Sequence, residues 1–111
     1  MSFAITYSPQ APDRADVDAH RGAMLLEFGS NTCGHCRRAQ PLISAAAAGH
    51  AGVEHTKVED GPGRPLGRSY RVKLWPTLIF LVDGAEVERL VRPTDEAAIR
   101  AAFARIDSAA P

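Results

Sequence analysis

Apolar residues of this chain fall in short runs separated by stretches of helical periodicity, a pattern typical of strands connected by helices. The run at residues 24–28 is almost continuously apolar, as a central strand covered on both faces requires. Alternation at residues 3–7 and the run at residues 53–58 predict further strands. Because helices are predicted between these strands, we expect right-handed crossovers and parallel pairing among them.

Capping residues and helix formers predict where the helices lie. The first helix is expected to begin at Pro12 and to end at Gly22. Further helices are expected over residues 37–48, over residues 66–70, and from Pro93 through Ile106. Pro41 falls inside the second helix, where it should kink the first turns, unless that helix begins only at Pro41. In the last helix, Ile99, Phe103 and Ile106 share one face.

Asp83-Gly84, between the apolar runs at residues 77–82 and 85–91, predicts a hairpin of two antiparallel strands. The expected order is βαβαβ, a connecting turn, and ββα. We therefore predict an α/β fold whose central mixed sheet has a parallel core, an antiparallel hairpin and helices on both faces. A length of 111 residues fits a single domain, residues 1–111.

The charge balance and the hydropathy indicate which classes of partner and which cellular location to expect. With 13 Lys+Arg against 13 Asp+Glu, the formal net charge is zero, which gives no basic footprint for nucleic acid or a membrane surface. No stretch approaches the ~20 apolar residues of a membrane span, and residues 1–10 lack the pattern of a signal peptide. We therefore expect a cytoplasmic monomer whose partners are proteins or small molecules.

The only two cysteines, Cys33 and Cys36, lie two residues apart between the predicted central strand and the next helix. Thiols at this spacing can close a small disulfide ring and reopen it, which makes the pair a two-electron switch. With His50 and His55 they also match the C-x₂-C-x₁₃-H-x₄-H spacing of a zinc finger. We favour no metal, because glycines flank His50 and a domain of this size needs no zinc for its core. Both histidines are then expected to be solvated.

The position of Cys33 at a helix start predicts that it is the nucleophile. Unpaired N–H groups of the first turn and the helix dipole stabilise a thiolate there, and His35, Arg37 and Arg38 add positive or polar character. Cys36, one turn into the helix, is expected to face inward and to act as the resolving thiol. His35 should make the pair more oxidising than a proline at that position would.

Several motifs keep a recognisable spacing along the chain. They are Glu27-Phe28, Cys33-Gly34-His35-Cys36, Pro41, Lys57, Trp75-Pro76-Thr77 and Asp83-Gly84. With these motifs the chain resembles the thioredoxin family over roughly residues 20 to 106. The resemblance implies the thioredoxin fold and a thiol-disulfide oxidoreductase that reduces protein disulfides and needs no bound cofactor. Its partners would be disulfide-containing proteins and an electron donor, either a reductase or glutathione.

The resemblance also implies roles for two charged residues on neighbouring strands. Glu27 matches a buried acidic residue that accepts the proton of the resolving Cys36, and Lys57 matches its lysine partner. We expect desolvation to raise the pKa of Glu27. Without the resemblance, Lys57 would be taken as a surface lysine and Glu27 as a residue of an exposed strand edge.

On the substrate side, the resemblance implies that Pro76 is a cis-proline beside the disulfide and that the Trp75 backbone pairs with an incoming peptide. Gly34 and His35 complete the expected substrate-binding surface. Trp75 could equally fill the core. The chain departs from the family pattern at Gly29 and Thr32, where aromatic residues are usual, and at Arg92-Pro93, where a small flexible residue is usual.

Two other functions stay open at the level of sequence. The Cys-Gly-His-Cys tetrapeptide resembles that of protein disulfide isomerases, so the pair could serve an oxidase or isomerase. Alternatively, the fold could be a redox-inert binding module.

Overall fold

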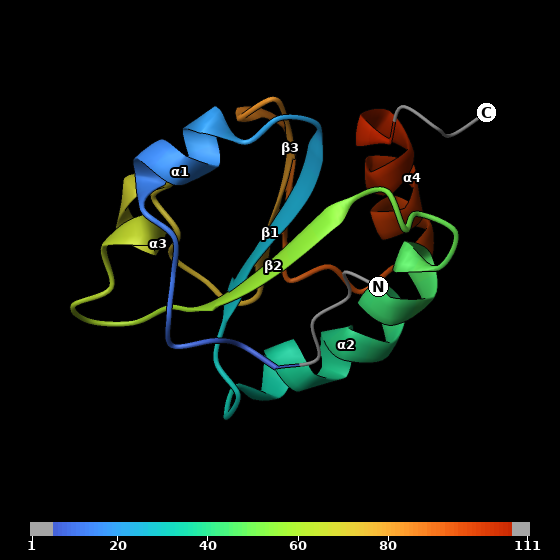
Figure 1. The fold of residues 1–111 in the computed structure, drawn as a ribbon. Helices are drawn as coiled ribbons and strands as arrows, with labels where there is room; N and C mark the ends of the chain where they lie inside the picture. The colour runs from blue at the N-terminus through green and yellow to red at the C-terminus, as the bar shows by residue number, and fades with distance from the viewer. Residues whose placement is uncertain (1–5, 108–111) are drawn as a thin grey trace.

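The computed structural model describes residues 6–107. Figure 1 shows the helices and strands in chain order: α1 (Arg14–Ala19), β1 (Ala23–Gly29), α2 (Gly34–Ala47), β2 (Glu54–Glu59), α3 (Pro65–Ser69), β3 (Thr77–Val82), β4 (Ala85–Val91) and α4 (Glu96–Ile106). Most of the strand predicted at residues 3–7 lies outside the described residues. Just after it, Ser8 forms an isolated parallel bridge to Val58 of β2.

The four strands form one mixed sheet in the order β2-β1-β3-β4. β1 pairs in parallel with β2 and antiparallel with β3, and β3 pairs antiparallel with β4. The apolar run of β1 therefore lies in the interior of the sheet, as predicted, because both of its edges are hydrogen-bonded to neighbours. The predicted α/β fold with a mixed sheet is confirmed.

Helices cover both faces of the sheet (Figure 1). On one face, Leu25 of β1 packs with Ile43 of α2 and Phe103 of α4. On the other face, Leu26 packs with Val17 of α1 and Leu66 of α3. The alternation of side chains along β1 thus sends odd-numbered residues toward α2, which is the helix that carries the cysteine motif.

The starts of α2 and α4 differ from the prediction by the most, three residues each, and side-chain caps explain both. α2 begins at Gly34 because the Cys33 sulfur caps it, accepting a hydrogen bond from the Cys36 N–H at 3.2 Å. Pro41 is inside this helix, so the alternative that the helix begins there is wrong. α4 begins at Glu96 because the Asp95 carboxylate accepts from the Ala97 N–H at 2.9 Å.

The Asp83-Gly84 turn joins β3 and β4 as predicted. Both residues have positive φ, 50° and 81°, which a two-residue turn matching the strand twist requires. Over residues 6–107, none of the helices has the length and apolar character needed to span a membrane.

Candidate active site

The cysteine motif sits where β1 ends and α2 begins. Cys33 is partly exposed at the N-cap of α2, and Cys36 is fully buried; both thiols are free. The Cys33 sulfur accepts from the Cys36 N–H, and the Cys33 carbonyl accepts from the Arg37 N–H at 3.0 Å. Cys33 is therefore partly accessible, and the first turn of the helix supplies a backbone donor to its sulfur.

Cys36 is held as a protonated thiol by its surroundings. Burial raises the pKa of the Cys36 thiol to about 12, and the neighbouring Cys33 adds to this effect. Hydrogen bonding with the Ser30 backbone and, to a smaller extent, with the Tyr7 side chain opposes this rise. An attack by Cys36 therefore needs a group nearby that removes its proton.

Glu27 lies beneath the cysteines with no exposed surface. Its carboxylate accepts hydrogen bonds from the Tyr7 hydroxyl, from His55 Nε2 at 2.8 Å and from Gln40 Nε2 at 3.0 Å. Burial acts to raise the pKa of Glu27, but the hydrogen bond and charge of His55, the charge of Lys57 and the Gln40 amide together lower it. The predicted upward shift is thus wrong, and Glu27 is a buried carboxylate.

Lys57 reaches Glu27 through an intermediate residue. The two residues stand opposite each other in the parallel β1–β2 register, and Lys57 is 3% exposed. The Lys57 ammonium donates to Gln40 Oε1 at 2.6 Å, while Gln40 donates to Glu27. Burial lowers the pKa of Lys57, although the charge of Glu27 opposes this shift. The surface position considered for Lys57, like the exposed edge considered for Glu27, is wrong.

Tyr7, Gln40 and His55 belong to this buried network, and the sequence analysis did not assign them to it. Gln40 could have been found from its spacing, because it lies one turn after Cys36 and donates to the Cys36 carbonyl at 2.9 Å. His55 lies two residues before Lys57, on the same side of β2. Tyr7 offers no comparable local pattern, since it contacts the site from a segment outside the sheet.

Both histidines of the zinc-finger alternative have other partners, and the expectation that they are solvated is wrong. His55 is 5% exposed and bonded to Glu27. His50 stacks on Phe103, with ring centroids 5.3 Å apart, and its Nδ1 lies 2.6 Å from Asp107 Oδ2. Within residues 6–107, His, Cys, Asp and Glu side chains form no group of three that could hold a metal ion.

Gly29, one of the departures from the family pattern, has a steric reason. A Cβ at this position would lie 2.6 Å from Tyr7 Cζ and 2.7 Å from the Cys36 sulfur, closer than real Cβ contacts. The missing side chain lets the Tyr7 ring and Cys36 pack together at the end of β1.

The Trp75–Pro76 peptide bond is cis, the isomer that the resemblance implied. Pro76 is buried and Trp75 is half-buried, with its indole N–H donating to Asp60 Oδ2 at 2.9 Å. Arg92 Nε donates to the Trp75 carbonyl at 2.8 Å. The Trp75 backbone, which is expected to pair with a substrate strand, therefore already accepts a hydrogen bond at its carbonyl from Arg92, the residue that replaces the usual small one.

Gly34 and His35 form the exposed first turn of α2 beside Cys33. Arg38 donates to His35 Nδ1 at 3.1 Å. The charge of Arg92, with a smaller contribution from Arg38, lowers the pKa of His35. The arginines therefore disfavour the charged form of His35.

Comparisons with known proteins agree with this geometry. The family model described as Thioredoxin matches residues 10–105. The structure of thioredoxin 2 from Pseudomonas aeruginosa PAO1 in its reduced form has 49% sequence identity and a TM-score of 0.84, covering 94% of this chain and 96% of that one. Thioredoxin from Chlamydia trachomatis is 40% identical over 76 residues, 68% of this chain and 74% of that protein.

Other relatives are much longer than this chain. The TPR repeat-containing thioredoxin TDX from Arabidopsis thaliana is 32% identical over 91 residues, which cover 82% of this chain but 24% of the relative. The family model covers most of the chain, and the sheet order and the Cys-x-x-Cys motif at the start of α2 agree with it. The chain adopts the thioredoxin fold and belongs to the thioredoxin family.

Proposed function

We propose that the protein is a thiol-disulfide oxidoreductase that reduces protein disulfides through Cys33 and Cys36. The observation that carries this proposal is the asymmetry of the pair: Cys33 is partly exposed at the helix N-cap, while Cys36 is fully buried behind it. A nucleophile needs access to its target, and a resolving thiol needs protection from it.

The reaction consists of two thiol-disulfide exchanges. The Cys33 thiolate attacks one sulfur of the substrate disulfide, forming a mixed disulfide and releasing the other substrate sulfur as a thiolate. Cys36, once deprotonated, attacks the Cys33 sulfur, which closes the Cys33–Cys36 disulfide and releases the second substrate thiolate. Two electrons thus pass to the substrate, and a reductase or glutathione must return them.

Glu27 is the proposed acceptor of the Cys36 proton, with Tyr7 between them. The Tyr7 hydroxyl donates to Glu27 and is also hydrogen-bonded to the Cys36 sulfur. As Cys36 loses its proton to the Tyr7 oxygen, Tyr7 passes its own proton to Glu27. Lys57 and Gln40 then act by holding the carboxylate in place.

The proposed substrate surface consists of Trp75, Pro76, Gly34 and His35 around the Cys33 sulfur. A protein of this function works as a monomer in a compartment that an electron donor keeps reducing, and we propose the cytoplasm. An oxidase or isomerase is a second candidate, because the Cys-Gly-His-Cys tetrapeptide resembles that of disulfide isomerases.

Insulin reduction tests the proposal. The wild type should reduce insulin with dithiothreitol or with a thioredoxin reductase system, and Cys33→Ser should abolish the activity. Equal inactivity of both proteins with all donors would favour the redox-inert binding module. The reduction potential of the pair, measured against glutathione, separates the remaining functions: a value at the oxidising end of the family would replace the reductase by the oxidase or isomerase.

A further inference from the structure

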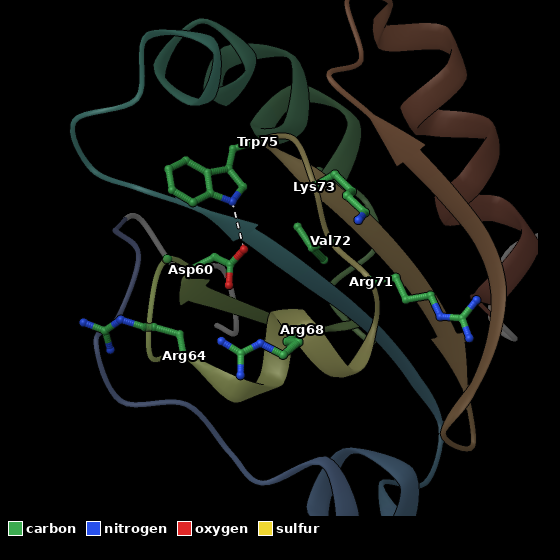
Figure 2. Close-up of a pocket in the computed structure, with 8 residues that line it drawn as sticks. Asp60, Arg64, Arg68, Arg71, Val72, Lys73 and Trp75 are labelled. Atoms are coloured by element: carbon green, nitrogen blue, oxygen red, sulfur yellow. Dashed lines mark hydrogen bonds between the residues drawn. The ribbon is translucent and has the colours of Figure 1, made fainter.

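A basic cavity of about 420 Å³ opens beside Trp75, the residue before the cis-proline. Its wall comes from three segments: residues 60–61 after β2, α3 with its N-cap, and residues 71–75 before β3 (Figure 2). Its cationic side chains are Arg64, Arg68, Arg71 and Lys73. Trp75, the residue before Pro76, lines the same cavity, so the cavity adjoins the proposed substrate surface.

The positive charge of the basic cavity is largely uncompensated. Arg64 pairs with Glu59 at 3.1 Å, and the lining carboxylate of Asp60 accepts from the Trp75 indole. Among the ion pairs of residues 6–107, none involves the three other cations, Arg68, Arg71 and Lys73. Because the whole chain has a formal net charge of zero, this concentration of cations is local and not part of a general basic character.

Arg71 occupies a backbone position that favours glycine. Its φ is 58°, in the left-handed region at the end of α3, where the Arg71 N–H donates to the Arg68 carbonyl at 3.0 Å. The neighbouring Val72 N–H donates to the Gly67 carbonyl at 2.9 Å, completing the turn. An arginine held at such a position points to a use for its side chain beyond the turn itself.

The basic cavity is also fixed relative to the cysteines. The Asp60 N–H donates to the carbonyl of Gly29, the last residue of β1, at 2.9 Å. Since Cys33 follows the same end of β1, the cavity and the nucleophile lie at the carboxyl ends of two neighbouring parallel strands. A substrate segment that contacts both Cys33 and Trp75 would therefore reach the rim of the cavity.

We propose that the basic cavity binds acidic side chains of the protein substrate close to its disulfide, so that the chain prefers acidic substrates. This inference rests on the proposed function, because it assigns the charge of that function's substrate. Carboxylates placed over the cavity would pair with Arg68 and Lys73, while Arg71, whose side chain points away from Trp75 and Asp60 (Figure 2), would add positive charge at the rim. These charges would steer and orient the substrate before Cys33 attacks.

The test measures binding without redox chemistry. Two disulfide-free peptides are added to the protein; they differ only in carrying glutamates or glutamines at the same positions. Binding is followed by the fluorescence of Trp75, the only tryptophan of the chain. The glutamate peptide should bind about tenfold more tightly at low salt, as expected for a few partly exposed charge pairs, and this advantage should shrink as salt is added.

Two variants locate the effect. Arg71→Gly suits the left-handed φ and should lower the affinity for the glutamate peptide about threefold. The double change Arg68→Gln with Lys73→Gln should remove most of the remaining preference. Arg100→Gln, on α4 and paired with Glu96, is the control and should leave binding unchanged.

Equal binding of the two peptides, or an equal loss in the Arg100→Gln control, would overturn the inference. So would displacement of the glutamate peptide by micromolar inorganic phosphate, which would assign the cavity to a phosphate ligand. If the wild type reduces insulin but binds the glutamate and glutamine peptides equally, this inference alone is overturned. If the wild type prefers the glutamate peptide but does not reduce insulin, the proposed redox function is overturned instead.

Discussion

Removing the Tyr7 hydroxyl should slow the resolution of the mixed disulfide by Cys36 and spare the first attack by Cys33. In Tyr7→Phe the ring stays in place, but Glu27 loses a donor and Cys36 loses the neighbouring oxygen that takes its proton in the proposed path. Tyr7 is 4% exposed, so water does not replace the lost group. A hydrogen bond to a charged group contributes about 1.5–3 kcal/mol.

This energy gives the expected size of the effect. If the hydroxyl acts fully on the formation of the Cys36 thiolate, the rate of resolution falls roughly 10- to 150-fold, since about 1.4 kcal/mol corresponds to a factor of ten. Attack by Cys33 on a substrate disulfide should change little, because Tyr7 contacts the buried thiol. Rapid mixing with a disulfide peptide, quenched by acid and analysed by mass, resolves both steps. In the variant, the mixed disulfide should accumulate.

Tyr70→Phe is the matched control. The Tyr70 hydroxyl is buried on the opposite face of the sheet and has no hydrogen-bond partner among the described residues. Its removal should leave both rates unchanged. A resolution rate in Tyr7→Phe equal to that of the wild type would refute the proposed proton path, and so would an equal slowing of both steps.

Three further predictions concern packing, acid stability and the substrate surface. Gly29→Ala should lower the free energy of unfolding by about 1–3 kcal/mol, because its Cβ would crowd Tyr7 and Cys36. Denaturant titration should show no such loss for Gly52→Ala, whose Cβ would meet nothing within 4 Å; equal losses would contradict the steric argument. The pKa of Glu27 is lowered on folding, so its contribution to stability is present above its unfolded pKa of about 4.3 and is lost as pH falls through the lower folded pKa. Wild type should therefore lose more unfolding free energy between pH 6 and pH 2 than Glu27→Gln, and identical losses would sink this expectation. Arg92→Gly suits the φ of 50° and removes the charge that lowers the His35 pKa. An NMR titration should show the pKa of His35 moving up toward its ordinary value, and an unchanged value would exclude Arg92 as the cause.

Local sequence patterns predicted the framework of the fold. The apolar run of β1 and the Asp83-Gly84 turn fix the centre and one edge of the sheet, because burial and turn geometry are set within a few neighbouring residues. Helix starts were less predictable. The start of α2 depends on a sulfur acting as a cap, and cysteine is not among the usual capping residues.

The buried polar network was predicted only in part. Glu27 and Lys57 came from the resemblance, but the pKa shift of Glu27 has the opposite direction, because His55, Lys57 and Gln40 together outweigh the desolvation that the sequence suggested. Tyr7 meets Glu27 across 20 positions and His55 meets it across 28. Contacts over such separations leave no periodic pattern in the sequence, so a lone tyrosine or histidine could not be assigned to the site.

Trapping with single-cysteine variants shows which cysteine attacks the substrate and which one resolves the mixed disulfide. Cys36→Ser and Cys33→Ser are each mixed with the same disulfide substrate, and the masses of the products are followed over time. If Cys33 attacks and Cys36 resolves, Cys36→Ser should quickly accumulate a stable mixed disulfide through Cys33, while Cys33→Ser should form almost none because Cys36 is buried. Equal or faster capture through Cys36 would contradict this assignment.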